Sequence, residues 1–152
     1  MHLSMKHAKV VLASDHAGFP LKELVKAHLQ SKNIECIDVG THSEERVDYP
    51  AIIRAGCEIV LLQGIPGFIF GGSGNGEAMA ANKMKGIRAA LCYSEEIARL
   101  ARSHNDANVM SMGARFTDAE LAYRMVDIFL DTEFEGGRHI PRVNDLDTPL
   151  QS

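Results

Sequence analysis

The stretch GFIFGGSGNGEAMAANK, residues 67–83, combines three features that decide the fold. It begins with a short apolar run at 67–70, which predicts a buried strand. Residues 71–76 follow with four glycines, and the small-residue segment 77–84 then predicts a helix. Glycine costs about 0.5–1 kcal/mol relative to alanine inside helices and strands. The glycines therefore indicate a loop whose backbone comes close to a ligand.

The same order of strand and then helix recurs along the chain. Further apolar runs predict four more strands, at residues 8–14, 34–39, 87–93 and 109–112. Helical periodicity and capping residues predict the intervening helices at 20–29, at 49–62, after a cap at Ser94, and from a cap at Thr117 to about Leu130. Five strand–helix repeats predict a single-domain, three-layer Rossmann-like α/β fold with a five-stranded parallel sheet.

We expect residues 1–152 to form one domain, with residues 1–7 flexible and a polar tail at 133–152 that contributes to the site or to a dimer. The net charge of −4 and the absence of a Lys/Arg cluster do not favour a nucleic-acid or membrane surface. Cys36, Cys57 and Cys92 are odd in number and widely spaced, which predicts free thiols rather than disulfides or a zinc site. With no apolar span and no signal-peptide pattern, we expect a cytoplasmic protein.

Several polar residues fall where the predicted strands end. Asp15 and His16 follow the first strand, Tyr49 begins the second helix, and Arg115 follows the fifth strand. Ligands of such folds bind at the carboxyl ends of the strands. Each residue alone is more typical of a cap, a core residue or a solvated charge, but their coincidence with the glycine loop at one edge favours a site.

The glycine loop favours an anion site, because its backbone N–H groups and the following helix N-terminus attract negative charge. No Gly-Lys-Ser/Thr follows, so the loop is not a Walker motif, and its spacing is a poor dinucleotide fingerprint. Glu95 nevertheless stands about twenty residues on, where a ribose-binding acid could lie.

Glu77, directly after the loop, fits either of two roles: an acid favoured by the dipole in the first turn of a helix, or a base acting on a carbon acid. An unperturbed glutamate has a pKa of about 4.3 and is ionised at neutral pH.

His104 poses a geometric question. It ends the fourth predicted helix and therefore leads to the amino end of the sheet, opposite the glycine loop. The basic residues of the tail, Arg138, His139 and Arg142, have the same ambiguity. These residues are either structural or serve a site on a neighbouring subunit.

Six segments together resemble the ribose-5-phosphate isomerase B family. They are SDHAG (14–18), DYP (48–50), GGSGNGEAMAANK (71–83), GIRA (86–89), SHNDAN (103–108) and GGRH (136–139). They run through nearly the whole chain, and the related galactose-6-phosphate isomerase subunits share much of the pattern. The resemblance implies a homodimer or a dimer of dimers, with active sites shared between subunits. It also implies interconversion of D-ribose 5-phosphate and D-ribulose 5-phosphate, in the pentose phosphate pathway, through a cis-enediol and without cofactor or metal.

The resemblance also assigns roles to individual residues. Asp15 and His16 match a sugar-binding pair, Tyr49 lies near the substrate, and His104 opens the furanose ring with Asn105 beside it. The phosphate pocket is matched by Arg115, Arg138, His139 and Arg142. The backbone N–H groups of the loop are expected to hold the enediolate oxygen, and the loop residues concerned are Gly72, Gly74, Asn75 and Gly76.

Many members of the family carry a catalytic cysteine at the position of Gly71. This sequence resembles the subgroup in which a glutamate is the base, so Glu77 is the expected base and Ser73 assists at the substrate oxygens. No cysteine is then required for proton transfer.

Two alternatives remain open from the sequence. One is the same chemistry on a six-carbon sugar 6-phosphate of the allose or galactose type. The other is a flavodoxin-like nucleotide- or FMN-binding module, which would leave Glu77, His104 and Arg142 without roles.

Overall fold

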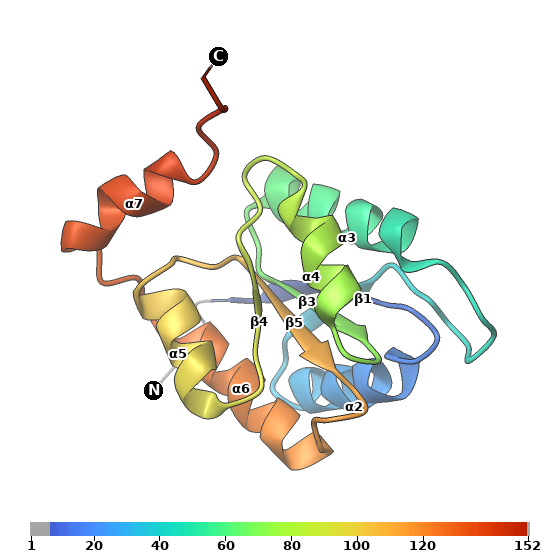
Figure 1. The fold of residues 1–152 in the computed structure, drawn as a ribbon. Helices are drawn as coiled ribbons and strands as arrows, with labels where there is room; N and C mark the ends of the chain where they lie inside the picture. The colour runs from blue at the N-terminus through green and yellow to red at the C-terminus, as the bar shows by residue number, and fades with distance from the viewer. Residues whose placement is uncertain (1–6, 152) are drawn as a thin grey trace.

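The computed structural model describes residues 7–151 as a sheet covered by helices on both faces (Figure 1). All five strands are parallel, in the order β2-β1-β3-β5-β4. They are β1 Lys9–Ser14, β2 Glu35–Asp38, β3 Gly67–Gly71, β4 Ala89–Leu91 and β5 Val109–Gly113. The expected Rossmann-like α/β sheet is confirmed. The expectation for residues 1–7 concerns mainly residues 1–6, which lie outside the described residues.

Alternate residues of each strand face different helices, as the period of two in a strand requires. Val10 and Leu12 of β1 face one layer, and Val11 and Ala13 face the other. The first layer contains α2 Phe19–Gln30, α5 Glu95–Ser103 and α6 Ala119–Asp131. The second contains α3 Tyr49–Gln63 and α4 Asn75–Asn82.

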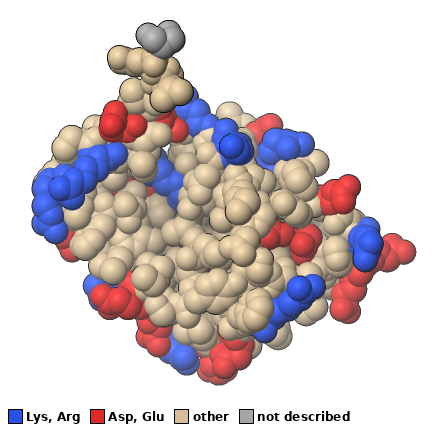
Figure 2. Space-filling view, in the orientation of Figure 1, with Lys and Arg blue, Asp and Glu red and all other residues tan. Residues whose placement is uncertain are grey.

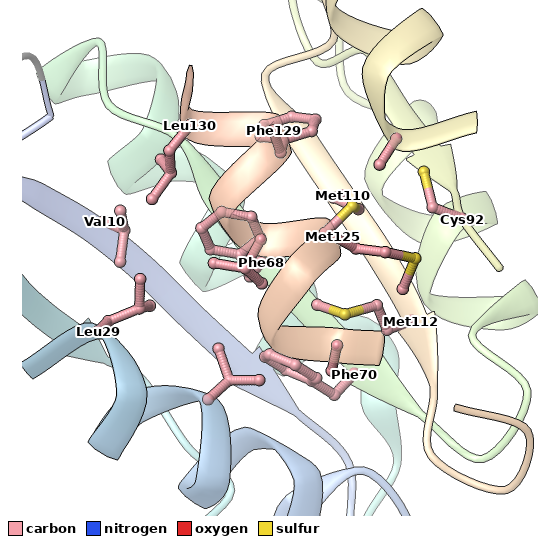
Figure 3. Packing of buried hydrophobic residues seen from close by; sticks show 14 of the residues in the cluster. Val10, Leu29, Phe68, Phe70, Cys92, Met110, Met112, Met125, Phe129 and Leu130 are labelled. Atoms are coloured by element: carbon pink, nitrogen blue, oxygen red, sulfur yellow. The ribbon is translucent and has the colours of Figure 1, made fainter. Parts of the chain in front are cut away.

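The larger core lies under α6 (Figure 3). Met125 and Phe129 of this helix are buried against Phe68 of β3 and Met110 of β5. The rings of Phe68 and Phe129 meet edge to face with centroids 5.5 Å apart, a favourable aromatic arrangement. This packing holds α6 against β3 and β5, the strands that lead to the glycine loop and to Arg115.

The main differences from the sequence expectations lie at the cap of α6, in β4 and in the tail. Asp118, not Thr117, caps α6, because its carboxylate accepts a hydrogen bond from the Leu121 N–H, whereas Thr117 is buried. The strand expected at 87–93 is shorter, since β4 is an edge strand that pairs only with β5 over three residues. The tail is partly helical, with a 3₁₀ turn η1 at Gly137–His139 and a helix α7 at Ile140–Asp145.

A buried ion pair joins α2 to β2. Lys22 is fully buried, and its Nζ lies 2.6 Å from Oδ2 of Asp38, while the more exposed Lys26 approaches the same oxygen at 3.2 Å. Burial alone would raise the pKa of the Asp38 carboxyl, but hydrogen bonds from Lys22, from the Gly40 N–H and from Lys26 hold it below its usual value. Gly40 in turn accepts a hydrogen bond from the Ser14 N–H at 2.7 Å. The pair therefore supports the segment that borders the end of β1.

We predict that Lys22→Met lowers the free energy of unfolding by about 3 kcal/mol at pH 7, because it leaves a buried carboxylate without its main partner. Asp38 has a lowered pKa in the folded protein, so its stabilisation is present above the usual value of 3.8 and is lost as the pH falls through the lowered pKa. The loss of unfolding free energy in the variant should therefore be smaller in acid than at pH 7. Urea unfolding of the wild type and the variant, at pH 7 and at a pH below 3.8, measures this loss.

The matched control is Lys26→Met, which removes a partly exposed cation from the same carboxylate and should cost less than about 1 kcal/mol. Equal losses in the two variants would contradict the assignment of Lys22 as the dominant partner.

Candidate active site

The carboxyl ends of β1, β3 and β5 converge on the glycine loop at 71–76. Gly74 has a positive φ of 84° and caps α4, so its conformation favours glycine. The Ser111 hydroxyl donates a hydrogen bond of 2.8 Å to the Gly74 carbonyl, and Tyr93 donates one to the Ser73 carbonyl. The loop is therefore tied to β5 and to the end of β4, with its N–H groups at the start of α4.

Glu77 lies in the first turn of α4 and is 3% exposed, next to Asp15, which is 8% exposed at the end of β1. Burial raises the pKa of Glu77 to about 7; its own backbone N–H opposes the rise, whereas the hydrogen bond and the charge of Asp15 add to it. The unperturbed pKa expected from the sequence is therefore wrong. Asp15 is held in turn by the Gly18 N–H, which donates to its Oδ1 at 2.8 Å.

Gly71 explains how a buried carboxyl fits at this position. A Cβ atom at residue 71 would collide with the carboxyl group of Glu77. A side chain at 71 and the carboxyl group of residue 77 therefore occupy the same space. A thiol at residue 71, which the family resemblance implies for many members, would therefore not fit beside this carboxyl group.

Tyr49 and His16 border the same space. The Tyr49 hydroxyl lies against Gly76, where a Cβ atom would collide with it. Nδ1 of His16 accepts a hydrogen bond from the Val47 N–H at 3.2 Å, so a neutral His16 carries its proton on Nε2. Tyr49 begins α3, and Val47 just before it orients the imidazole of His16, which follows β1. The two contacts give this edge a phenol and an imidazole donor.

The remaining loop contacts involve Ser73 and Arg115. The Ser73 hydroxyl accepts a hydrogen bond of 3.2 Å from the Asn75 N–H. Arg115 is exposed, and a Cβ atom at Gly72 would lie 3.2 Å from its Cζ, so its guanidinium borders the loop. A cation and several N–H groups thus face the same edge as the buried carboxyls.

The other predicted residues form a second cluster, away from the first. His104 follows the end of α5, and its ring stacks on that of His139 with centroids 4.4 Å apart. Burial lowers the pKa of His139, and the charges of Arg138 and His104 lower it further. In Figure 1, α7 projects from the rest of the fold near the end of α5. In Figure 2, basic side chains gather at the start of α7. Arg138 and Arg142 lie in this exposed region.

Asn105 lies beside the second cluster. It is exposed and lines a groove of about 420 Å³ between β4 and the residues that follow α7, including Leu146 and Asp147. One chain therefore brings together Asp15, His16, Tyr49, the loop, Glu77 and Arg115. It does not bring His104, Asn105, Arg138, His139 and Arg142 to them.

Sequence reasoning missed two residues that contact the candidate site. Tyr93 holds the loop through the Ser73 carbonyl, and burial together with the charge of Glu77 raises its pKa. Its place just beyond the end of a strand on the binding edge was the available signal. Oε1 of Glu135 lies 3.9 Å from Nε2 of both His104 and His139. The spacing of four residues between Glu135 and His139 was a weaker signal in the sequence.

Comparison with known proteins gives a consistent result. The family model described as Ribose/Galactose Isomerase matches residues 10–146. Ribose-5-phosphate isomerase B of Escherichia coli strain K12 is 44% identical over 141 residues, which cover 89% of this chain and 91% of the relative. The enzyme of the same name from Mycolicibacterium paratuberculosis is 43% identical, over 91% of this chain and 89% of its own.

Solved structures agree in fold over nearly the same span. Ribose 5-phosphate isomerase of Thermotoga maritima matches with a TM-score of 0.91 and 48% identity, over 93% of this chain and 98% of that one. Ribose-5-phosphate isomerase B of Mycoplasma genitalium, with bound ribulose-5-phosphate, matches with a TM-score of 0.86 and 38% identity. The match covers 91% of this chain and 93% of that one. Across residues 7–151, the helices are too short or too polar to cross a membrane. The chain is thus an isomerase that belongs to the ribose/galactose isomerase family.

Proposed function

We propose that this protein interconverts D-ribose 5-phosphate and D-ribulose 5-phosphate through a cis-enediolate, as a step of the pentose phosphate pathway. The observation that carries the proposal is the buried carboxyl of Glu77, with a pKa of about 7, beside a loop of backbone N–H groups. The names of the relatives and the bound ribulose-5-phosphate of the Mycoplasma genitalium structure support the choice of substrate.

Glu77 is the proposed base. It removes the proton from C2 of the aldose and returns it to C1, so the carboxyl alternates between ionised and protonated forms. A pKa near the working pH suits both halves of that cycle. The N–H groups of the loop, with Ser73, stabilise the negative charge that develops on the substrate oxygen. Asp15, His16 and Tyr49 bind the sugar in this proposal.

The second cluster is proposed to act across a homodimer interface. In one chain His104 lies at the amino side of the sheet and Glu77 at the carboxyl side. The tail also exposes apolar side chains, with Ile140 46% and Leu146 62% exposed. We propose that the tail docks on a second copy, so that His104 opens the sugar ring and Arg138, His139 and Arg142 join Arg115 around the phosphate. Residues 7–151 would then act as a single domain with a shared site, in the cytoplasm.

The experiment that decides the substrate is a coupled assay that compares ribose 5-phosphate with allose 6-phosphate and galactose 6-phosphate. We expect the highest kcat/KM for ribose 5-phosphate, because the relatives at 43–44% identity are named for this substrate. A higher kcat/KM for either six-carbon substrate would refute the proposed specificity. A nucleotide or FMN that raises the melting temperature of a protein inactive on all three sugars would instead favour the binding-module alternative.

Glu77→Gln should be both less active and more stable. Loss of the base lowers kcat by about 10²–10⁴-fold. The folded-state pKa of Glu77 is raised from 4.5 to about 7. The wild type therefore loses stability as the pH rises from 4.5 through 7, by about 3 kcal/mol at most. Glutamine avoids this loss, so the stability gain should be absent at pH 4 and full at pH 8 in urea unfolding.

The control for both effects is Glu58→Gln, the same charge change at an exposed position of α3. It should leave kcat and the pH dependence of stability unchanged. A Glu77→Gln enzyme with near-wild-type turnover would remove this residue from the mechanism.

The shared site predicts complementation between two inactive variants. Mixing His104→Ala with Glu77→Gln under subunit exchange should restore activity, because one site of each mixed dimer then contains both intact residues. The activity is measured after exchange, with heterodimers quantified by mass spectrometry using a tag on one variant. The absence of recovery despite proven heterodimers would contradict the shared-site arrangement.

A further inference from the structure

Three potential metal ligands meet where the tail begins. The ligand atoms of His104, Glu135 and His139 all lie within 4.8 Å of one another. Nε2 of His104 and Nε2 of His139 are each 3.9 Å from Oε1 of Glu135. These residues come from two segments, the end of α5 and the turn around η1, so packing rather than sequence proximity assembles the set.

His139 supplies an independent sign that a partner is missing. The residue is 6% exposed, and its Nε2 is buried without a hydrogen-bond partner. Buried polar atoms are nearly always satisfied by protein, water or an ion. The same nitrogen faces Glu135 and lies next to the ring of His104. A ligand bound by all three side chains would satisfy it.

The chemistry of the donors selects the kind of ligand. Two imidazoles and one carboxylate suit Zn²⁺ and similar first-row divalent ions. With bonds of about 2.0–2.2 Å in a tetrahedron, the donor atoms must lie roughly 3.3–3.6 Å apart. The two histidine–glutamate separations of 3.9 Å exceed this by a few tenths of an ångström, and the separation between the two histidine nitrogens is within 4.8 Å. Side-chain rotations that draw the three donors together would complete the site. A fourth position would remain for water.

We propose that His104, Glu135 and His139 form a binding site for a Zn²⁺-type divalent cation, and that the bound cation inhibits the isomerase. The inhibitory half rests on the proposed function, in which His104 and His139 act on the substrate. A cation bound to both imidazoles would occupy the groups needed for ring opening and phosphate binding. It would also tie the tail to α5, since the ligands come from both.

Nearby charges limit the affinity. Arg138 and Arg142 both act on His139, and Glu135 is the anionic member of the ligand set. The positive charges of the two arginines oppose the binding of a divalent cation beside them. Binding should therefore depend strongly on the negative charge of Glu135. The variant Glu135→Gln tests this dependence.

The cation site is tested first without any substrate. Titrating the purified full-length protein with Co²⁺ should produce the visible absorption of a four-coordinate ion with nitrogen and oxygen ligands. Glu135→Gln should weaken Co²⁺ binding at least about tenfold, since losing a ligand costs no less than losing a group that only orients one. The matched control Asp131→Asn, an exposed acid earlier in the same segment, should bind as the wild type does. His104→Gln is a second variant that should also lose binding.

Several outcomes would overturn the site. They are no visible absorption in the wild type, an unchanged affinity in both Glu135→Gln and His104→Gln, and intense near-ultraviolet absorption that reports a thiolate ligand. Glu77→Gln should bind Co²⁺ like the wild type, because its changed residue lies in the other cluster. The cation site can therefore be confirmed or refuted even if the protein isomerises none of the sugar phosphates tested.

Inhibition is tested separately on the active enzyme. Zn²⁺ should lower the isomerase rate, EDTA should restore it, and the half-inhibiting concentration should rise at least about tenfold in Glu135→Gln but not in Asp131→Asn. Zn²⁺ bound at this site with an unchanged rate would refute the inhibitory half of the proposal.

Discussion

Close approach of bare backbone at the carboxyl ends of β1, β3 and β5 is the constraint on which the rest of the site depends. A Cβ atom at Gly18 would collide with the Phe70 carbonyl, and one at Gly113 would collide with the Ser73 carbonyl. The chain can therefore bring three strand ends and a helix start into contact only where side chains are missing. That contact encloses the space in which Glu77 and Asp15 meet. The helix N-terminus then points its N–H groups at the same space.

The two buried carboxyl systems of this protein have opposite energetics. Asp38 has Lys22 as a direct partner, so its charged form is favoured and its pKa is lowered. Glu77 has another carboxyl group beside it, so burial and repulsion favour its neutral form. The first arrangement stabilises the fold at neutral pH, whereas the second weakens it. Buried carboxyl groups with raised pKa values are concentrated at functional sites, and this supports the proposed role of Glu77 in proton transfer.

The separation of the two predicted clusters is itself informative. His104 and the tail lie by the amino side of β5, and parallel strands cannot place both ends of a sheet at one point of a monomer. In the proposed dimer, a partner surface would bring the stacked imidazoles, the exposed arginines and the apolar side chains of α7 to the glycine loop. The same arrangement brings Glu135 to the two histidines, which gives this cluster a ligand chemistry of its own.

The amino-acid sequence was sufficient to predict the layered fold and the glycine loop at the end of a strand. These predictions follow from short-range rules, namely hydrophobic periodicity and the conformational freedom of glycine. The local pattern left Glu77 as either a first-turn acid or a base, and its assignment as the base came from the family resemblance and stays a prediction. The local rules predicted the cap of α6 at Thr117, whereas the structure has it at Asp118, because threonine and aspartate are both typical capping residues. Packing in the folded chain produces three features that the sequence did not predict: the raised pKa of Glu77, the Lys22–Asp38 pair and the approach of Glu135 to His104. Each depends on burial and on contacts between segments far apart in the chain, and no local pattern encodes how much water such packing removes.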